Sequence, residues 1–335
     1  MISIIVVGHN HRKDLKGCFD SLLKSGYKNF KIIFVDNGSS DGSLDFVRKN
    51  YPKIIAIKNN NTGYAGGNNV GIRKAIRLKT KYIFILNPDT IIDENCLKQL
   101  SSQAKENRIL QPLFLIYQKG KKTNLINTTG SYLNFMGISY CSNYREKKQA
   151  AHSSQIPSAS GAGFFIPVKI FKDIGLFKSR FFMYFEDTDL SWRARMAGYE
   201  IYLQNEAIVY HKYSFSKSKK KYYFAERNRL DFIFSSFEIK TILLIFVPFL
   251  INEILITIFS LIDGWFFYKI AASASFLGRI GPVLKDRRRL KRRVRDRELV
   301  QYLSGEVSFS EKKIPLQNFY NQVYCTYWSL VKKLI

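Results

Sequence analysis

Short apolar runs rich in β-branched and aromatic residues recur along the first quarter of the chain, at residues 2–7, 31–35, 54–57 and 82–86. Most are apolar throughout, as is typical of strands covered by helices on both faces. The stretches between them have helical spacing, with Leu15, Phe19 and Leu22 in the first. Strands and helices therefore alternate, which predicts a doubly wound α/β sheet.

The alternation stops from 105 to 160, where polar, turn-prone pieces separate short apolar ones. This predicts an inserted, partly antiparallel region that makes the sheet mixed. A new element follows Ser160-Gly161-Ala162-Gly163, and the pattern then predicts a helix from 186 to 197. Gly198 stands where the end of such a helix needs a left-handed residue.

The last third of the chain combines an apolar stretch with a basic one. Residues 241–262 are interrupted only by Asn252 and Glu253, and the stretch is long enough to cross a bilayer. Lysine and arginine flank both of its ends, so charge does not choose an orientation, and a helix or helical hairpin in the membrane plane explains the flanks better. Residues 285–297 form a polybasic stretch. We therefore expect a membrane surface contact through 241–297.

The net charge of +27 favours a partner rich in negative charge, such as nucleic acid, anionic lipid or a phosphorylated substrate. The four cysteines lie far apart without a CxxC pair, so neither a zinc site nor a disulfide framework is predicted, and a reducing setting fits best. The first apolar run is too short for the core of a secretion signal. A cytosolic protein is the expectation.

Two polar loops follow predicted strands. In VDNGSSDGS, Asp36 is expected at the carboxyl end of the second strand, where a base or ribose can be hydrogen-bonded; a turn in which Ser40 or Asp41 caps a helix is the alternative. In NTGYAGGNNVG, glycines allow close approach of a ligand, and the following helix start favours phosphate. The GxGxxG order of dinucleotide-binding loops is absent, which argues against a nicotinamide-dependent dehydrogenase.

Three further segments carry candidate chemistry. Asp89, in LNPDT after the fourth strand, is a hard oxygen ligand suited to Mg²⁺ or Mn²⁺, although such a turn is often only a helix start. In FMYFEDTDLSW, aromatic residues lead into Glu186, Asp187 and Asp189, and a half-shielded aspartate is a suitable general base. Asp187 is the predicted base, with its two acidic neighbours orienting acceptor hydroxyls. His211 ends an apolar strand, where it is either structural or a metal ligand.

Taken in order, these motifs resemble the family 2 glycosyltransferases of the GT-A fold, and most closely their rhamnosyltransferase-like branch. The resemblance covers about residues 1–235 and implies metal ligation by Asp89 and His211, with NPD in place of a DxD motif. Asn87 departs from that motif's first aspartate. The implied nucleotide-binding residues are Asn10, Asp36, Asn37, Gly67, Asn68 and Asn87. The implied acceptor-binding residues are Glu186, Asp189 and Trp192.

The resemblance implies an inverting transfer of a sugar, with rhamnose favoured, from a nucleotide-sugar donor to a saccharide or polyprenyl-linked acceptor. It also implies a divalent cation, a place on the cytoplasmic face of the membrane and no nucleic-acid partner. A catalytic domain is expected over 1–235, with a nucleotide-binding half at 1–104 and an acceptor-binding half at 105–235, followed by a membrane-associating helical tail at 236–335. The alternative is a nucleic-acid or anionic-surface binding module, motivated by the basic tail.

Overall fold

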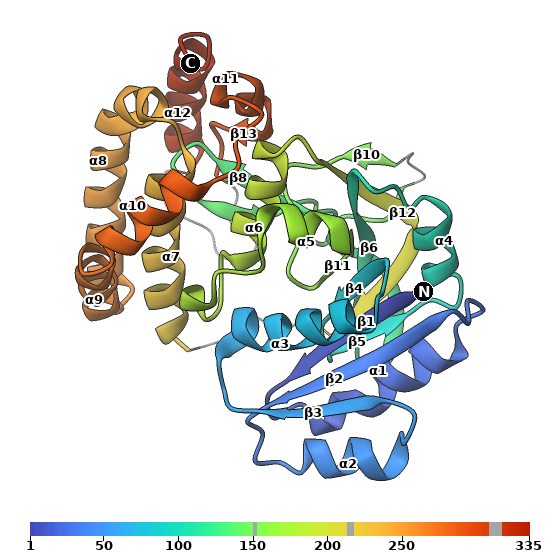
Figure 1. Cartoon of the computed structure of the whole chain (residues 1–335). Coiled ribbons are helices and arrows are strands. Elements are labelled where there is room, and N and C mark those ends of the chain that lie inside the picture. Colours follow the sequence, from blue (N-terminus) through green and yellow to red (C-terminus); the bar gives the residue numbers. More distant parts are fainter. Residues whose placement is uncertain (150–152, 213–217, 308–316) are drawn as a thin grey trace.

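The computed structural model describes residues 1–149, 153–212, 218–307 and 317–335. Within them a central sheet of ten strands has the order β10-β12-β6-β11-β4-β1-β2-β3, with β5 added to β12 and β7 to β6 (Figure 1). The predicted first four strands are confirmed as β1 (Ile2–Gly8), β2 (Phe30–Asn37), β3 (Ile55–Asn59) and β4 (Tyr82–Leu86). The others are β5 (Thr90–Ile92), β6 (Arg108–Gln118), β7 (Lys121–Thr128), β10 (Ser154–Gln155), β11 (Gly163–Pro167) and β12 (Glu200–His211).

The strand directions decide where polar residues gather. Strands β1 to β4 pair in parallel, and β6 pairs in parallel with β12. Strand β11 lies between β4 and β6 and is antiparallel to both, so β6 and β12 run in the same direction as β4. The carboxyl ends of six strands therefore meet at one edge of the sheet, which is where ligands bind in such folds.

Helices cover both faces of the sheet, which explains the apolar strands. Helices α1 (Arg12–Lys24), α2 (Ser43–Asn50) and α4 (Cys96–Ser102) pack on one face, where Ile4 and Val6 point. Helices α3 (Gly63–Arg77), α5 (Val168–Ile174) and α6 (Glu186–Met196) pack on the other, where Ile5 points. The predicted end of α6 is also confirmed, since Gly198 has a φ of +84°.

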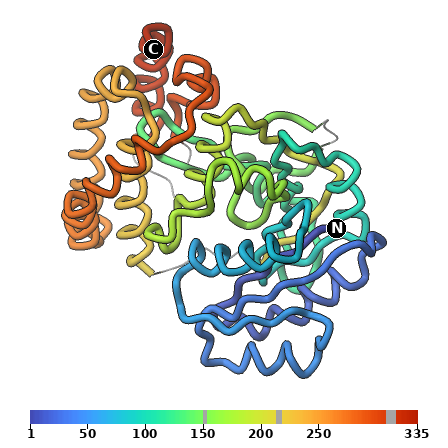
Figure 2. The backbone as a smooth tube through the Cα atoms, viewed as in Figure 1, coloured from blue at the N-terminus to red at the C-terminus, as the bar shows by residue number. Residues whose placement is uncertain are grey.

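The C-terminal helices form a lobe beside the sheet (Figure 2). They are α7 (Lys220–Ser236), α8 (Ile239–Ile262), α9 (Phe266–Leu277), α10 (Ile280–Arg289), α11 (Asp296–Leu299) and α12 (Gln317–Val331). A second, small sheet joins this lobe to the preceding part, because β13 (Leu303–Ser304) pairs with β8 (Ser131–Asn134), which pairs with β9 (Ser139–Cys141).

A third hydrophobic core is shared between this lobe and the preceding part of the chain. Phe135 stacks on Trp328 of α12 with ring centroids 4.9 Å apart, and Trp192 of α6 packs against Phe232 and Phe237. The domain boundary placed at residue 235 stays a prediction about folding units. The packing does not break there, because α7 ends in this shared core.

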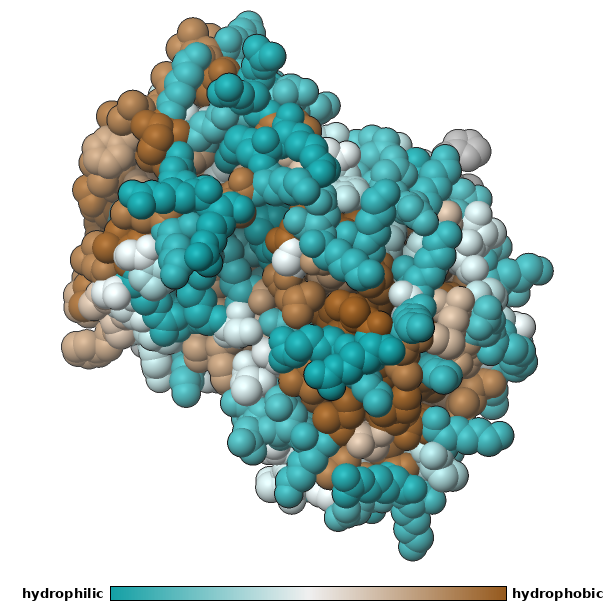
Figure 3. Space-filling view, viewed as in Figure 1, coloured by the Kyte–Doolittle hydropathy of each residue, from teal (hydrophilic) through white to brown (hydrophobic). Residues whose placement is uncertain are grey.

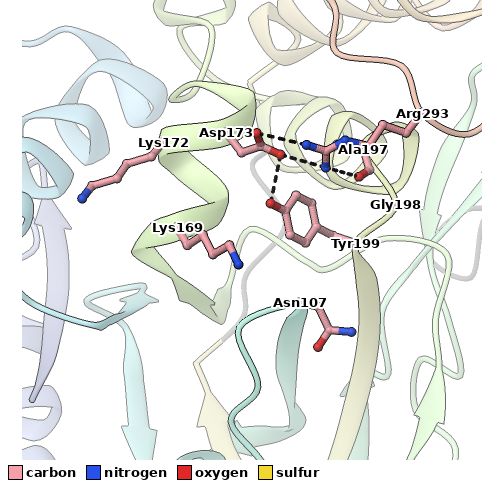
Figure 4. Close-up of a pocket in the computed structure, with 8 residues that line it drawn as sticks. All are labelled: Asn107, Lys169, Lys172, Asp173, Ala197, Gly198, Tyr199 and Arg293. Carbon is pink, nitrogen blue, oxygen red and sulfur yellow. Dashed lines mark hydrogen bonds and ion pairs between the residues drawn. The ribbon is translucent and has the colours of Figure 1, made fainter.

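Part of the polybasic stretch forms ion pairs and hydrogen bonds with other segments of the protein. Figure 4 shows a pocket between α5, the end of α6 and the start of β12, where Arg293 reaches Asp173 and the carbonyl of Ala197. The backbone N–H groups of Arg293 and Val294 donate to the carbonyl of Met196. The pocket lies at the sheet edge opposite the carboxyl ends and contains none of the predicted site residues. These contacts hold the C-terminal end of α6.

The close packing of α3 on β1 provides a test of the fold. A Cβ on Gly71 would lie 2.5 Å from Ile5 Cγ2, whereas a Cβ on Gly281 of α10 would meet nothing within 4 Å. We expect Gly71→Ala to lower the free energy of unfolding by about 1–3 kcal/mol through overpacking. Gly281→Ala is the control and should leave the free energy of unfolding unchanged or raise it slightly. Urea unfolding followed by circular dichroism measures both, and equal midpoints for the two variants would contradict the packing argument.

Candidate active site

Asp89 and His211 lie together at the carboxyl edge. The strand β12 ends at His211, which is opposite Thr90 of β5, and its Nε2 is 3.3 Å from Asp89 Oδ1. The Nδ1 of His211 is 2.9 Å from Oδ1 of Asn127, which has no hydrogen to donate. When the imidazole is neutral and carries its proton on Nδ1, toward Asn127, the lone pair of Nε2 faces Asp89.

This pair fits a divalent cation. Asp89 Oδ1 is buried without a hydrogen-bond partner among the described residues, and the imidazole lone pair is directed at the same place. Burial raises the pKa of Asp89, but His211 with a proton on Nε2, as hydrogen-bond donor and positive charge, outweighs burial, and the net pKa is lowered. The carboxylate is therefore charged, and a cation held here would take the place of that proton. No cluster of three or more such ligands occurs within the described residues. A cation held here would need further oxygen atoms from a substrate, as Mg²⁺ usually does.

The first two strands end beside this pair in two connected loops. The backbone of Asn10 has a φ of +59°. Its side-chain oxygen accepts a hydrogen bond from the Ser40 N–H, and its own N–H donates to Ser39 Oγ. Asp36 is 3% exposed, and its Oδ1 has no hydrogen-bond partner among the described residues. A buried carboxylate oxygen at a strand end is suited to accept an N–H of a ligand. The predicted alternative also holds in part, because Asp41 caps the start of α2 by accepting the Ser43 N–H.

Asn37 and Gly67 have packing roles that the sequence did not indicate. The Asn37 amide donates to the Gly63 carbonyl and accepts from Asn59, so it holds the loop before α3. A Cβ on Gly67 would lie 2.6 Å from Val7 Cγ1, so this glycine is explained by helix–sheet contact alone. Asn68 donates to the Tyr64 carbonyl, and its buried Oδ1 has no hydrogen-bond partner in the described structure.

Asp187 is half-buried at the start of α6. Its Oδ2 accepts the Gly161 N–H at 2.6 Å, and its Oδ1 accepts the Thr188 N–H at 2.7 Å. Burial raises the pKa of Asp187 above its ordinary value, despite these hydrogen bonds. Burial and the charge of Asp187 raise the pKa of the neighbouring Glu186 well above its ordinary value. A carboxylate whose pKa is raised toward the working pH is a better proton acceptor.

The loop around Gly161 connects these groups. Gly161 donates its N–H to Asp187 and accepts the Tyr64 hydroxyl from α3 at 2.5 Å. The next residue, Ala162, accepts the Asn87 N–H at 3.0 Å. The turn that carries Asn87 and Asp89, the glycine-rich helix α3 and the start of α6 therefore converge on one loop.

Two predicted acceptor-binding residues lie elsewhere. Asp189 is 0% exposed and forms ion pairs with Lys178 and Arg193, at 2.6 and 2.8 Å. Trp192 is 2% exposed within the third core. The structure does not bring either side chain to the carboxyl edge, because both point from α6 into the protein.

The sequence reasoning missed Asn127, Tyr64 and Gly161. Asn127 gave no local signal, because it is 84 positions from the histidine that it contacts. Tyr64 lies inside the glycine-rich segment, and a large aromatic side chain among glycines is a signal that could have been followed. Gly161 was noted only within the short segment that precedes a new element.

The chain is similar in sequence and in fold to several known proteins. Residues 3–175 match the family model described as glycosyl transferase family 2. The low-salt glycan biosynthesis hexosyltransferase Agl10 of Haloferax volcanii is 29% identical over 197 residues, which are 58% of this chain and 61% of that protein. The UDP-Glc:alpha-D-GlcNAc-diphosphoundecaprenol beta-1,3-glucosyltransferase WfaP of Escherichia coli is 35% identical over 91 residues, 27% of this chain and 35% of that protein. The chain thus matches less than two thirds of either relative.

A solved structure shares the fold. The crystal structure of GalNAc-T7 with UDP, GalNAc and Mn²⁺ matches with a TM-score of 0.58 at 17% sequence identity, over 70% of this chain and 48% of that one. At this identity the likeness concerns the fold alone. It confirms the predicted mixed α/β architecture of the GT-A type.

The contact between His211 and Asn127 gives a test of the cation site. We expect Asn127→Ala to weaken Mn²⁺ binding by roughly 10–100-fold, because the imidazole loses the group that fixes its tautomer and orientation. Asn124→Ala, at an exposed position of the same strand, is the control. Mn²⁺ is titrated in the presence of a nucleoside diphosphate and free Mn²⁺ is followed by electron paramagnetic resonance. Unchanged affinity in the Asn127 variant would remove His211 from the cation site.

Proposed function

Because the chain belongs to glycosyl transferase family 2, we propose that it transfers a sugar from a nucleotide-sugar donor to an acceptor hydroxyl with inversion at the anomeric carbon. The observation that carries this proposal is the convergence of Asp187 and the Asp89–His211 pair on the loop around Gly161. One place then offers a proton acceptor and a cation site suited to a diphosphate.

The mechanism is a single displacement. Asp187 takes the proton of the acceptor hydroxyl. At the same time the hydroxyl oxygen attacks the anomeric carbon from the side opposite the leaving group. The new carbon–oxygen bond forms as the bond to the nucleoside diphosphate breaks, and the electron pair leaves with the diphosphate. Asp89 and His211 would hold a divalent cation, Mg²⁺ or Mn²⁺. When bound, it supplies positive charge against the charge that develops on the departing diphosphate.

The substrate classes follow from the same edge. Asp36, with its unpartnered carboxylate oxygen, is proposed to accept a hydrogen bond from the nucleobase, and Asn10 and Asn68 to line the donor side. Asn87, at the start of the turn that carries Asp89, is proposed to face the ribose. For the donor sugar we retain rhamnose, which rests on the resemblance of the sequence motifs. For the acceptor we propose a saccharide or a polyprenyl-linked saccharide in polysaccharide biosynthesis; the name of WfaP describes such an acceptor for that protein.

The proposed base gives the central test. We expect Asp187→Asn to bind the donor normally but to lower turnover by roughly 10²-fold or more. The assay uses a panel of nucleotide sugars with Mn²⁺ and measures release of nucleoside diphosphate, with and without acceptor. Donor affinity is measured by calorimetry. Asp187→Asn retaining most of the turnover would remove Asp187 from the role of base.

Asp189→Asn is the matched control for this test. Because it removes the nearest carboxylate from the buried cations of Lys178 and Arg193, we expect lower stability but unchanged turnover per folded molecule. The pH profile adds a second readout. Burial raises the pKa of Asp187. As the pH is lowered, the wild-type rate should therefore begin to fall at a pH above the ordinary aspartate pKa of about 3.9.

The lobe formed by α8 to α10 and α12 carries an unusual apolar surface. Helix α8 alone, among the described helices, is long and apolar enough to cross a membrane. Its two polar interruptions face inward: Asn252 accepts the Tyr320 hydroxyl of α12, and Glu253 pairs with Lys269 of α9 at 2.6 Å. The outward side of α8 exposes large apolar residues along its length, which form the brown edge in Figure 3: Leu243, Phe246, Val247, Leu250, Ile251, Ile254, Leu255, Ile258 and Leu261.

Exposed cations lie on another helix of the same lobe. In α10 the side chains of Lys285, Arg288 and Arg289 are exposed next to the apolar Ile280 and Leu284. An apolar helix face beside exposed basic residues is typical of proteins that lie in the interface of an anionic bilayer. We propose that the lobe rests in the plane of the membrane, on its cytoplasmic side, rather than crossing it.

The surface gives a further test. Replacing Lys285, Arg288 and Arg289 with glutamine should lower partition onto anionic liposomes by roughly a hundredfold at low salt, because each such residue contributes about 1 kcal/mol. Neutral liposomes should show little difference. The matched control replaces Arg48, Lys49 and Lys53, which carry the same charge on and beside the distant helix α2. Sedimentation measures partition. Equal losses in both triple variants would indicate a net-charge effect and contradict a defined surface.

A further inference from the structure

The segment that leads into Asp187 has a strained backbone. Phe182, Tyr184 and Phe185 have φ values of +64°, +66° and +71°. Bulky residues rarely adopt this left-handed region, and each such residue costs on the order of 1–3 kcal/mol unless its surroundings hold it. The strain has a structural result. Phe185 is the residue directly before α6, so its conformation sets the direction in which Glu186 and Asp187 leave the segment.

Asn228 of α7 supplies the groups that hold this segment. Its Nδ2 donates to the carbonyls of Phe181, Met183 and Tyr184, at 2.9, 3.0 and 2.8 Å. Asn228 is 1% exposed, so these contacts are made in the protein interior. Two hydrogens serve three carbonyl acceptors, which ties the turn together at one point.

Arg227 fixes the orientation of that amide. Its Nε and Nη2 donate to Asn228 Oδ1 at 3.0 and 2.9 Å, so the oxygen faces the guanidinium and the NH₂ group faces the carbonyls. Nη2 also donates to the carbonyl of Phe181. The orientation of Asn228 is therefore determined by its neighbour and is not an arbitrary choice between oxygen and nitrogen.

The same segment also contacts the donor side of the site. The Phe182 carbonyl accepts the Ala65 N–H at the start of α3, and a Cβ on Gly63 would lie 2.2 Å from that carbonyl oxygen. Held by α7 on one side and by α3 on the other, the segment connects the glycine-rich helix with the proposed base.

We propose that Asn228 is a positioning residue of the transfer reaction, whose amide holds residues 181–184 in the conformation that directs Asp187 at the acceptor hydroxyl. This inference rests on the proposed function. Asn228 acts through the backbone of the segment. It is expected to affect the alignment of the base rather than the binding of donor or cation, whose proposed ligands lie on other elements.

The experiment replaces Asn228 with Asp, which has nearly the same volume but cannot donate, and with Ala. We expect kcat per donor-binding site to fall by roughly 10–100-fold, because a small misplacement of a catalytic group has that effect. The donor KM and Mn²⁺ affinity should stay within about twofold, since the loss lies in alignment rather than binding. The acid limb of the pH profile should move to lower pH, because a relaxed segment admits water to Asp187.

Asn252→Asp is the control, since Asn252 is also a buried asparagine with a side-chain hydrogen bond but lies in α8. It should change stability without changing kcat or the pH profile. The inference fails if an Asn228 variant that binds donor turns over at the wild-type rate. It fails equally if neither variant folds, because the amide is then required for the fold itself. A wild-type protein that transfers no sugar from any donor would instead contradict the proposed function.

Discussion

Buried charge on α7 is the constraint on which the C-terminal half of the structure depends. Between Glu226 and Asp231 every residue is buried and all but Leu230 are polar. A buried charge without a partner is strongly destabilising, so the neighbouring elements must supply partners. Glu226 pairs with Arg229 and with Lys269 of α9. Arg229 also pairs with Glu253 of α8. Asp231 pairs with Arg180, which also reaches Asp286 of α10. These pairings tie α8, α9 and α10 to the buried charges of α7 and Arg180.

Much of the sheet could be predicted from the sequence, because strands covered on both faces must be apolar throughout and because polar residues after them must gather at one edge. Asp36, Asp89 and His211 were placed correctly at that edge for this reason. The prediction that grouped Asp187 with Asp189 ignored helix geometry. Residues two apart on a helix point roughly 200° apart, so the two side chains must face opposite ways. Asp187 therefore faces the Gly161 loop, and Asp189 faces Lys178 in the interior.

The remaining features depend on contacts between distant positions and could not be predicted from local patterns. Asn127 and Asn228 are single amides without a motif, and their partners lie 84 and 44–47 positions away. The polybasic stretch resembled a uniform lipid-binding patch. In the structure it divides into exposed residues such as Arg288 and partly buried residues such as Arg287 and Arg292, whose side chains donate to backbone carbonyls within the protein. Composition shows how many cations a segment has, but only packing shows which of them are already engaged.

The two ends of α6 are held by parts of the chain that are synthesised after it. The segment before Asp187 receives its donors from Arg227 and Asn228, and the carbonyls of Met196 and Ala197 receive theirs from Arg293 and Val294. The start of α6 receives its donors once α7 has been made, whereas its end receives them only after α8 and α9, which lie between Asn228 and Arg293 in the chain. Helix α6, which carries the proposed base, is therefore held at both ends only after the helices with the apolar surface have been made.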